Sequence, residues 1–499
     1  MEIKVIAEDI VRVKAGAIIL NHFEGKKYRD GGFATVDRAL DGAISRLIRQ
    51  GDIKGKLNEI TLVHSLGKLP APRVVITGLG KPGELSTNKI RGAVAETCRW
   101  LRNRGVDDIA TVAHGAGINN ISPEGAAQAV TEGAILGLYT FRRYLTKREE
   151  DYTEIKQLAI VGSQEEKPLL EQGSARGKVL AEAANLARDM VNEPANYMTP
   201  AQMAQAATRL AESYHLEVTV LEREQMAELG MGALLGVAQG SQQPPKFIIL
   251  NYKGNNSEEI DLALVGKGIT FDAGGISIKP SEGMSDMKGD MAGGAAVMAA
   301  MKAIAQLKPR INVTAIIPAT ENLPSGSALK PGDILQAMNG KTIEVVNTDA
   351  EGRLILADAL SYAKKLGAKR IIDVATLTGA CIVALGKICS GAFSNNQKLA
   401  DQVIAAGTEA GELIWPMPMY DDYRELIKSD VADIKNIGNR YGGAITAAKF
   451  LAEFVEDTPW VHLDIAGTSQ SDKEKGYLVK GATGIPVRTL VNLVLSIAG

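Results

Sequence analysis

An acidic corner between a strand and a helix is the feature that most constrains the fold of this chain. Residues 347–354 read NTDAEGRL and place two carboxylates, Asp349 and Glu351, two positions apart. The apolar run at 342–346 predicts a strand before them, and helical spacing follows them. Open α/β sheets hold ligands at such corners. Gly352 would allow the irregular backbone that turns both carboxylates into one crevice.

Isolated acids at helix N-termini are commonly capping or dipole residues. A second charged cluster favours a functional role for the acidic pair. Residues 266–280 read GKGITFDAGGISIKP and follow a buried-strand pattern at 262–265. Lysine and aspartate are threaded there among glycines, which let a backbone approach a ligand closely. Residues 284–290 (MSDMKGD) then open an alanine- and glycine-rich helix expected at 291–307.

The two clusters supply a candidate site of seven charged side chains: Lys267, Asp272, Lys279, Asp290, Asp349, Glu351 and Arg353. Converging carboxylates repel one another, and bound cations are the usual resolution. Oxygen-rich ligation suits zinc, manganese, magnesium or cobalt, and two such ions can lower the pKa of a shared water toward ~7. A nearby lysine or arginine could stabilise an oxyanion. These residues predict metal-assisted hydrolysis, with peptide and phosphoester substrates both open.

Composition narrows the class of protein. A chain of 499 residues predicts two domains. With 56 basic and 58 acidic residues, it has no global attraction to nucleic acid or to an anionic membrane. The N-terminus lacks the apolar core of a secretory signal, and no apolar run has the length of a membrane span. Three cysteines without a C-x-x-C motif fit a reducing compartment and argue against a thiolate zinc site. We expect a cytoplasmic protein.

The first third of the chain alternates short apolar runs with helical patterns, which predicts a compact α/β domain with a mostly parallel sheet. The expected strands are 17–20, 59–63, 74–77, 109–112 and 157–161, and the expected helices are 88–103 and 123–139. Residues 78–83 satisfy G-x-G-x-x-G, the pattern of a dinucleotide site. Pro82 and Gly83 delay the helix, however, and Ser86 or Thr87 is the better N-cap, which favours a plain turn.

Several motifs resemble the leucyl aminopeptidases, also called cytosol aminopeptidases. The octet 347–354 and the stretch 265–279 are similar to signatures of that family. Further similar stretches follow in the family's order: 192–196 (NEPAN), 373–379 (DVATLTG), 442–447 (GGAITA), 460–467 (WVHLDIAG) and 480–484 (KGATG). The resemblance covers the chain from Lys178 onward, and the first third is similar only in general style.

The resemblance implies a two-domain α/β fold, in which the larger C-terminal catalytic domain has a central mixed sheet flanked by helices. A charged, glycine-containing stretch at 165–177 marks the expected boundary. We therefore predict an N-terminal α/β domain at 1–165, variable and related to assembly. A linker with a helix is predicted at 166–191, and the catalytic metallopeptidase domain at 192–499. The family also assembles as homohexamers.

The resemblance further implies a two-zinc exopeptidase. By the family pattern the tighter metal is held by Lys267, Asp272, Asp290 and Glu351. The looser metal, which exchanges for manganese, magnesium or cobalt, is held by Asp272, Asp349 and Glu351. Lysine binds a metal only in its neutral form, and a neighbouring dication would depress its pKa enough to allow this.

The remaining roles are also implied by the family pattern. Lys279 would polarise the scissile carbonyl and stabilise the tetrahedral oxyanion. Arg353 would cradle a bicarbonate that acts as general base. The α-amine of a peptide substrate would bind one metal, so that only the N-terminal residue, leucine or another apolar residue by preference, is removed. Met287 and Thr376 would line the substrate site.

Alternatives from other classes stay open at this point. A two-metal phosphoesterase shares the ligand chemistry, although a lysine among the ligands disfavours it. A non-catalytic scaffold with the same fold is disfavoured because all seven key residues are present. A nucleotide-dependent oxidoreductase depends on residues 78–83 alone.

Overall fold

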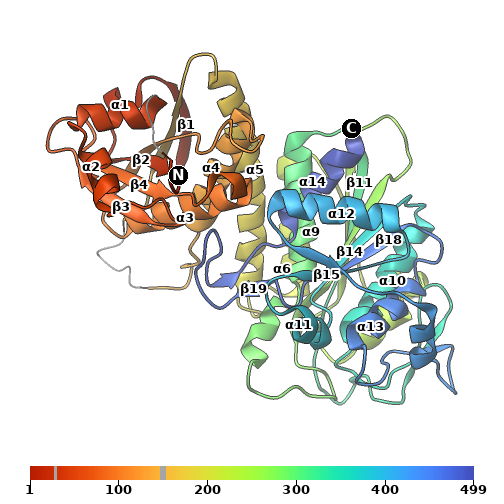
Figure 1. Ribbon diagram of the computed structural model, residues 1–499. Helices are drawn as coiled ribbons and strands as arrows, with labels where there is room; N and C mark the ends of the chain where they lie inside the picture. Colours follow the sequence, from red (N-terminus) through yellow and green to blue (C-terminus); the bar gives the residue numbers. More distant parts are fainter. Residues whose placement is uncertain (27–30, 147–152) are drawn as a thin grey trace. The chain divides into compact units, whose positions relative to one another are not determined.

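The protein, shown here as a computed structural model, is described at residues 1–26, 31–146 and 153–499 (Figure 1). By its internal contacts the chain divides into two compact units. Unit 1 is Met1–Glu182 with Asp472–Lys480, and unit 2 is Ala183–Ser471 with Gly481–Gly499. The predicted linker corresponds to one helix, α5 (Lys167–Asn192), and the division between the units falls inside it. Unit 1 also includes the segment Asp472–Lys480 from near the end of the sequence. The predicted domains are consecutive stretches of the chain and therefore do not include this segment in the first domain.

Unit 1 contains, among the described residues, a six-stranded sheet in the order β1-β6-β5-β2-β4-β3. The strands are β1 (Glu2–Ala7), β2 (Ala17–His22), β3 (Ile60–His64), β4 (Arg73–Gly78), β5 (Asp108–Val112) and β6 (Gln157–Gly162). Only β3 runs antiparallel to its neighbour. The helices beside them are α1 (Gly31–Ala39), α2 (Ala43–Gln50), α3 (Thr87–Arg102) and α4 (Pro123–Gly137), with short 3-10 turns at Ile10–Arg12 and Pro82–Glu84.

Side-chain alternation along β2 explains the layers of unit 1. Ile19 packs in a cluster that includes Ile90 of α3, whereas Ile18 packs in a second cluster that includes Val36 of α1 and Ile44 of α2. Both faces of the sheet are therefore covered by helices. This is the doubly covered arrangement that near-continuous apolar strands predict.

The glycine motif after β4 is a turn. Helix α3 begins only at Thr87, and the Ser86 hydroxyl accepts a hydrogen bond from the Lys89 amide at 3.3 Å, which caps it. A Cβ atom on Gly78 would lie 1.9 Å from the carbonyl oxygen of Lys56. The glycine therefore allows close backbone packing.

Unit 2 is built on a nine-stranded mixed sheet in the described chain, in the order β16-β15-β18-β14-β9-β11-β8-β7, with β10 paired to β11. Its strands are β7 (Glu217–Leu221), β8 (Lys246–Lys253), β9 (Leu262–Gly266), β10 (Gly268–Asp272), β11 (Asn312–Asn322), β14 (Ile371–Ala375), β15 (Ser390–Ser394), β16 (Ile414–Pro416) and β18 (Trp460–Asp464). The central strands β18, β14, β9 and β11 are mutually parallel, and they read as continuous buried apolar runs.

Helices cover both faces of this sheet (Figure 1). One face carries α6 (Pro200–Tyr214), α9 (Ala292–Leu307), α12 (Gln397–Ala410) and α14 (Val487–Ala498). The other carries α8 (Gly232–Ala238), α10 (Glu351–Lys365) and α13 (Gly443–Ala452). Smaller elements are α7 (Arg223–Glu228), α11 (Gly379–Leu385), the 3-10 helices η3 (Met284–Gly289) and η4 (Asp421–Ile427), and the short strands β12 (Ile334–Gln336), β13 (Thr342–Glu344), β17 (Ile434–Lys435), β19 (Gln470–Ser471) and β20 (Gly481–Ala482). No helix in the described ranges is long and apolar enough to cross a membrane.

A buried carboxylate, Asp358, joins α10 to α8. Its two oxygens accept hydrogen bonds from the amides of Leu234, in the first turn of α8, and Met338, each at 2.8 Å. Burial raises the pKa of Asp358 to about 7. Replacing Asp358 by alanine leaves the buried Leu234 amide and the partly buried Met338 amide unpaired, so we expect the free energy of unfolding to fall by about 3 kcal/mol.

Urea unfolding of the D358A variant measures this loss. D358N is the matched control, because its amide oxygen can still accept one of the two bonds and it should lose about half as much. A loss in D358A no larger than about 0.5 kcal/mol, the size of an ordinary surface substitution, would contradict the assignment.

Candidate active site

The predicted site residues converge at the carboxyl ends of central strands in unit 2. Lys267 directly follows β9, and Asp272 ends β10. Asp290 lies between η3 and α9, and Glu351 is the first residue of α10. Because β9 and β10 both run parallel to β11, their carboxyl ends share one edge of the sheet. This is the edge at which open α/β sheets bind ligands.

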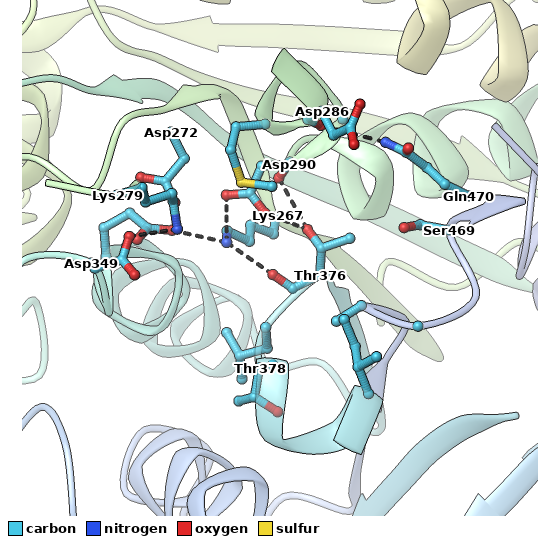
Figure 2. Close-up of a pocket in the computed structure, with 18 of the residues that line it drawn as sticks. Lys267, Asp272, Lys279, Asp286, Asp290, Asp349, Thr376, Thr378, Ser469 and Gln470 are labelled. Carbon is cyan, nitrogen blue, oxygen red and sulfur yellow. Dashed lines mark hydrogen bonds and ion pairs between the residues drawn. The ribbon is translucent and has the colours of Figure 1, made fainter. Parts of the chain in front are cut away.

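Three buried carboxylates form the centre of the site. Asp272, Asp290 and Glu351 are 2%, 8% and 2% exposed, and one ligand oxygen from each lies within 4.8 Å of the others. The Nζ atom of Lys267 lies 2.7 Å from Asp290 Oδ2 and 2.8 Å from Glu351 Oε1. Figure 2 shows Lys267 between Asp290 and Thr376. A single ammonium thus neutralises part of a densely acidic cluster.

A second lysine pairs with the outer acids. Lys279 Nζ lies 2.8 Å from Asp272 Oδ2 and 2.5 Å from Asp349 Oδ1. The Asp349 side chain is 34% exposed, so it borders solvent. The side-chain amide of Asn322 donates to Asp272 Oδ1 at 2.8 Å and orients that carboxylate from behind.

Glycines make room for these contacts, one of them in a way that the sequence does not reveal. Gly352 was expected to allow irregular backbone, but it belongs to the first turn of α10 and has no left-handed φ. A Cβ atom there would lie 2.5 Å from Lys267 Cε, so its missing side chain leaves space for the lysine. Gly274 does adopt a φ of +86°, as its loop requires, and a Cβ atom on it would lie 2.9 Å from Asp349 Oδ1.

Burial and mutual repulsion perturb the acids. Burial, and then the charge of Asp272, raise the pKa of Glu351 to about 8. Burial raises the pKa of Asp290 to about 6, against the opposing attraction of Lys267. Burial by itself would lower the pKa of Lys267, but its carboxylate neighbours raise it above the ordinary value. Strongly shifted groups gathered in one cavity are typical of functional sites.

The cluster fits a divalent cation. Glu351 Oε2 is buried and has no hydrogen-bond partner among the residues that the structure describes. An unpaired buried carboxylate oxygen is costly, and a bound cation would satisfy it. Carboxylate oxygens suit magnesium and manganese, and they also bind zinc. The three buried carboxylates can therefore hold a metal ion.

A cavity of about 420 Å³ opens onto these ligands. Met287 and Thr376 line it, together with the five predicted metal ligands and Lys279. The Thr376 hydroxyl donates to Asp290 Oδ1 at 2.6 Å, and its carbonyl accepts from Lys267 Nζ at 3.0 Å. Thr376 thus also orients two of the charged residues.

Arg353 is close to the site but does not line the cavity. It is 7% exposed, and one guanidinium nitrogen, Nη1, donates to the Asn436 carbonyl at 2.6 Å. Burial lowers its pKa to about 10. Its Nε atom is buried without a hydrogen-bond partner in the described chain.

Sequence reasoning missed several residues that line or support the cavity. Asp286, Ser469 and Gln470 line it, and Asp464 accepts bonds from the Leu377 amide and the Thr378 hydroxyl on its wall. The available signal was the pair of stretches at 373–379 and 460–467, of which only Thr376 had been assigned a role. Both end beside the cavity.

Comparison with known proteins identifies the family. The family model described as "Cytosol aminopeptidase family, catalytic domain" matches residues 185–491, and the model of its N-terminal domain matches residues 19–148. The chain belongs to the cytosol aminopeptidase family. A probable cytosol aminopeptidase of Alkaliphilus metalliredigens (strain QYMF) is 47% identical over 99% of both chains. One of Solibacter usitatus (strain Ellin6076) is 49% identical, also over 99% of both chains.

Solved structures agree with this family assignment. A mutant of tomato leucine aminopeptidase superimposes with a TM-score of 0.88 at 37% identity, over 99% of this chain and 96% of that one. The bottromycin maturation enzyme BotP in complex with Mn gives 0.86 at 34% identity, over 97% and 100%. The chain is a metal-dependent aminopeptidase, a hydrolase, and the predicted two-domain α/β fold is confirmed. No described feature favours the phosphoesterase or the scaffold.

Proposed function

We propose that this aminopeptidase removes leucine and other apolar residues from the free N-termini of peptides by a two-metal-activated water. The observation that supports this most directly is the convergence of four carboxylates and two lysines on one cavity. Two divalent ions would supply, when bound, a water of lowered pKa and a position for the substrate's α-amine.

The five ligands divide into two overlapping sets. Lys267, Asp272, Asp290 and Glu351 would hold one ion, and Asp272, Asp349 and Glu351 would hold the other, with zinc or manganese as the ions. The greater exposure of Asp349 supports a more readily exchanged second position. Lys267 must give up its proton to act as a ligand.

Lys279 would act on the scissile carbonyl. Its ammonium borders the cavity from the side of Asp272 and Asp349, and it would stabilise the negative charge that develops on the carbonyl oxygen. Met287 and Thr376 would contact the N-terminal side chain, with Met287 as adaptable apolar packing.

Arg353 would hold a bicarbonate beside the site. A buried guanidinium with an unpartnered Nε among the described residues suits a small planar anion. Bicarbonate would supply a general base when bound, which removes the need for a catalytic histidine. We also propose that the chain assembles as a homohexamer and works in the cytoplasm. The family resemblance supports the hexamer, and the scarcity of cysteine supports the reducing compartment.

Hydrolysis of leucine p-nitroanilide and of its N-acetylated form tests the proposal. Each substrate is measured after chelation and again after manganese or zinc is restored. We expect turnover of the free-amine substrate alone, and only with metal, because the α-amine needs a metal position.

Equal turnover of the acetylated substrate would overturn the exopeptidase assignment. Turnover that survives complete chelation, checked by elemental analysis of the protein, would overturn the role of the metal. Gel filtration with light scattering distinguishes a hexamer of the 53.0 kDa chain from smaller assemblies.

A further inference from the structure

Asp464 is a buried carboxylate outside the predicted ligand sets, and it fixes the wall of the cavity. It is the last residue of β18, which runs parallel to β14, and it is 1% exposed. Its Oδ1 atom accepts hydrogen bonds from the Leu377 amide at 3.2 Å and the Ala466 amide at 3.1 Å. Its Oδ2 atom accepts one from the Thr378 hydroxyl at 2.7 Å. These three partners line the cavity, and Asp464 lies behind them.

The segment that Asp464 holds also contains Thr376, which contacts two of the proposed metal ligands. The Thr376 carbonyl accepts from Lys267 Nζ at 3.0 Å, and the Thr376 hydroxyl donates to Asp290 Oδ1 at 2.6 Å (Figure 2). The Thr376 carbonyl and the Leu377 amide belong to one planar peptide group, so neither can move without the other. This peptide group is therefore held by Asp464 through its N–H and by Lys267 through its C=O.

The bond from Lys267 to this peptide suits a lysine that ligates a metal. A neutral amine would give its lone pair to the ion and keep two N–H donors, one of which the Thr376 carbonyl can accept. Asp464 strengthens the same bond, because an acceptor on the Leu377 amide polarises the peptide and makes its carbonyl a better acceptor. Groups that orient a metal ligand in this way raise the affinity of the site.

The two ligands that Thr376 contacts belong to only one of the proposed metal positions. Lys267 and Asp290 would hold the tighter ion and take no part in holding the exchangeable one. Asp349 would hold the exchangeable ion alone, and its side chain pairs with Lys279 instead, at 2.5 Å. An effect transmitted through Thr376 should therefore reach the tighter position and leave the other unchanged.

We infer that Asp464 is a positioning residue that fixes the peptide between Thr376 and Leu377 and thereby orients Lys267 for the tighter metal position. The inference rests on the proposed two-metal site. It adds to that site a side chain that would contact neither ion and that determines how tightly one of them is held.

Titration calorimetry of manganese binding to the chelated full chain tests the inference with the D464A variant. We expect the affinity of the tighter ion to fall about 10- to 100-fold and the affinity of the exchangeable ion to stay unchanged. D464N should restore the tighter affinity to within about threefold of the wild type. The asparagine Oδ1 can still accept both amides, and its Nδ2 can donate to the Thr378 hydroxyl oxygen.

D358A is the matched control, because it also removes a buried carboxylate that accepts two backbone amides, within α10. It should reduce stability and leave both metal affinities unchanged. Equal losses at both metal positions in D464A, or a loss in D358A as large as in D464A, would indicate general loosening of the fold and overturn the inference. A tighter affinity that D464A leaves unchanged would overturn it as well.

A milder variant applies if D464A does not fold. T378V removes only the hydroxyl that Asp464 Oδ2 accepts, and it should weaken the tighter ion alone, about three- to tenfold, the value of one hydrogen bond. Unchanged affinities in T378V would then decide against the inference. Failure of the loaded wild-type chain to hydrolyse leucine p-nitroanilide would refute the proposed reaction instead, since the comparison of metal affinities does not depend on turnover.

Discussion

Replacing Lys279 by methionine is expected to lower kcat about 10²–10³-fold, with a much smaller change in KM. The ammonium is the positive group at the cavity nearest to Asp272 and Asp349, and its charge acts on the oxyanion that forms only in the transition state. Methionine keeps most of the apolar stem and removes the charge. Steady-state kinetics with leucine p-nitroanilide measures both constants.

Metal content separates two explanations of such a loss. Lys279 also contacts two proposed metal ligands, so elemental analysis must accompany the kinetics. K279R, which keeps the charge, should recover part of the activity, although its planar head differs in geometry. If K279M binds the full metal complement and retains kcat within about threefold, well below the cost of losing an oxyanion donor, Lys279 is not the carbonyl-polarising group.

Metal affinity is expected to rise steeply with pH. In the metal-free protein the pKa of Glu351 is about 8 and the pKa of Lys267 lies above its ordinary value, so both carry protons near neutral pH. Binding a divalent ion requires these groups to deprotonate. Protons are therefore released on binding, and for each proton released the affinity should increase about tenfold per pH unit below the pKa that is titrating.

Calorimetry of manganese binding to chelated protein, in buffers of different ionisation enthalpy, counts the released protons. We expect more than one per chain at about pH 7, and about one fewer in E351Q, whose amide has no proton to lose. An affinity that is flat from about pH 6 to 9 would show that neither Lys267 nor Glu351 changes protonation on binding, and would remove Lys267 from the ligand set.

Much of the fold follows from local pattern. The apolar runs at 17–20, 74–77, 109–112 and 157–161 are strands β2, β4, β5 and β6. Short apolar runs between helical patterns are typical of buried strands. Periodicity does not give strand order, so it could not place β1 beside β6 at the sheet edge. Nor could it assign the late segment Asp472–Lys480 to unit 1, since that assignment depends on contacts distant in sequence.

The candidate site divides in the same way. The charged residues of 267–290 and 349–353 were predictable, because glycine-rich loops at strand ends present their side chains to one edge. The function of Gly352 was not predictable from the sequence. This glycine makes room for the side chain of Lys267, a residue far away in sequence. Asp286 and Gln470 meet only through tertiary structure, and nothing local to either indicates a shared pocket.

The two lysine–carboxylate pairings also bear on how the enzyme is made. Small zinc domains rely on their ion to fold, since nothing else neutralises their ligands. Here Lys267 and Lys279 already contact all four acids in the absence of metal, and a large apolar core lies beside them. Folding and metal binding can therefore be separate events. The chain can fold and accumulate when metal is scarce, and it can bind the metal later.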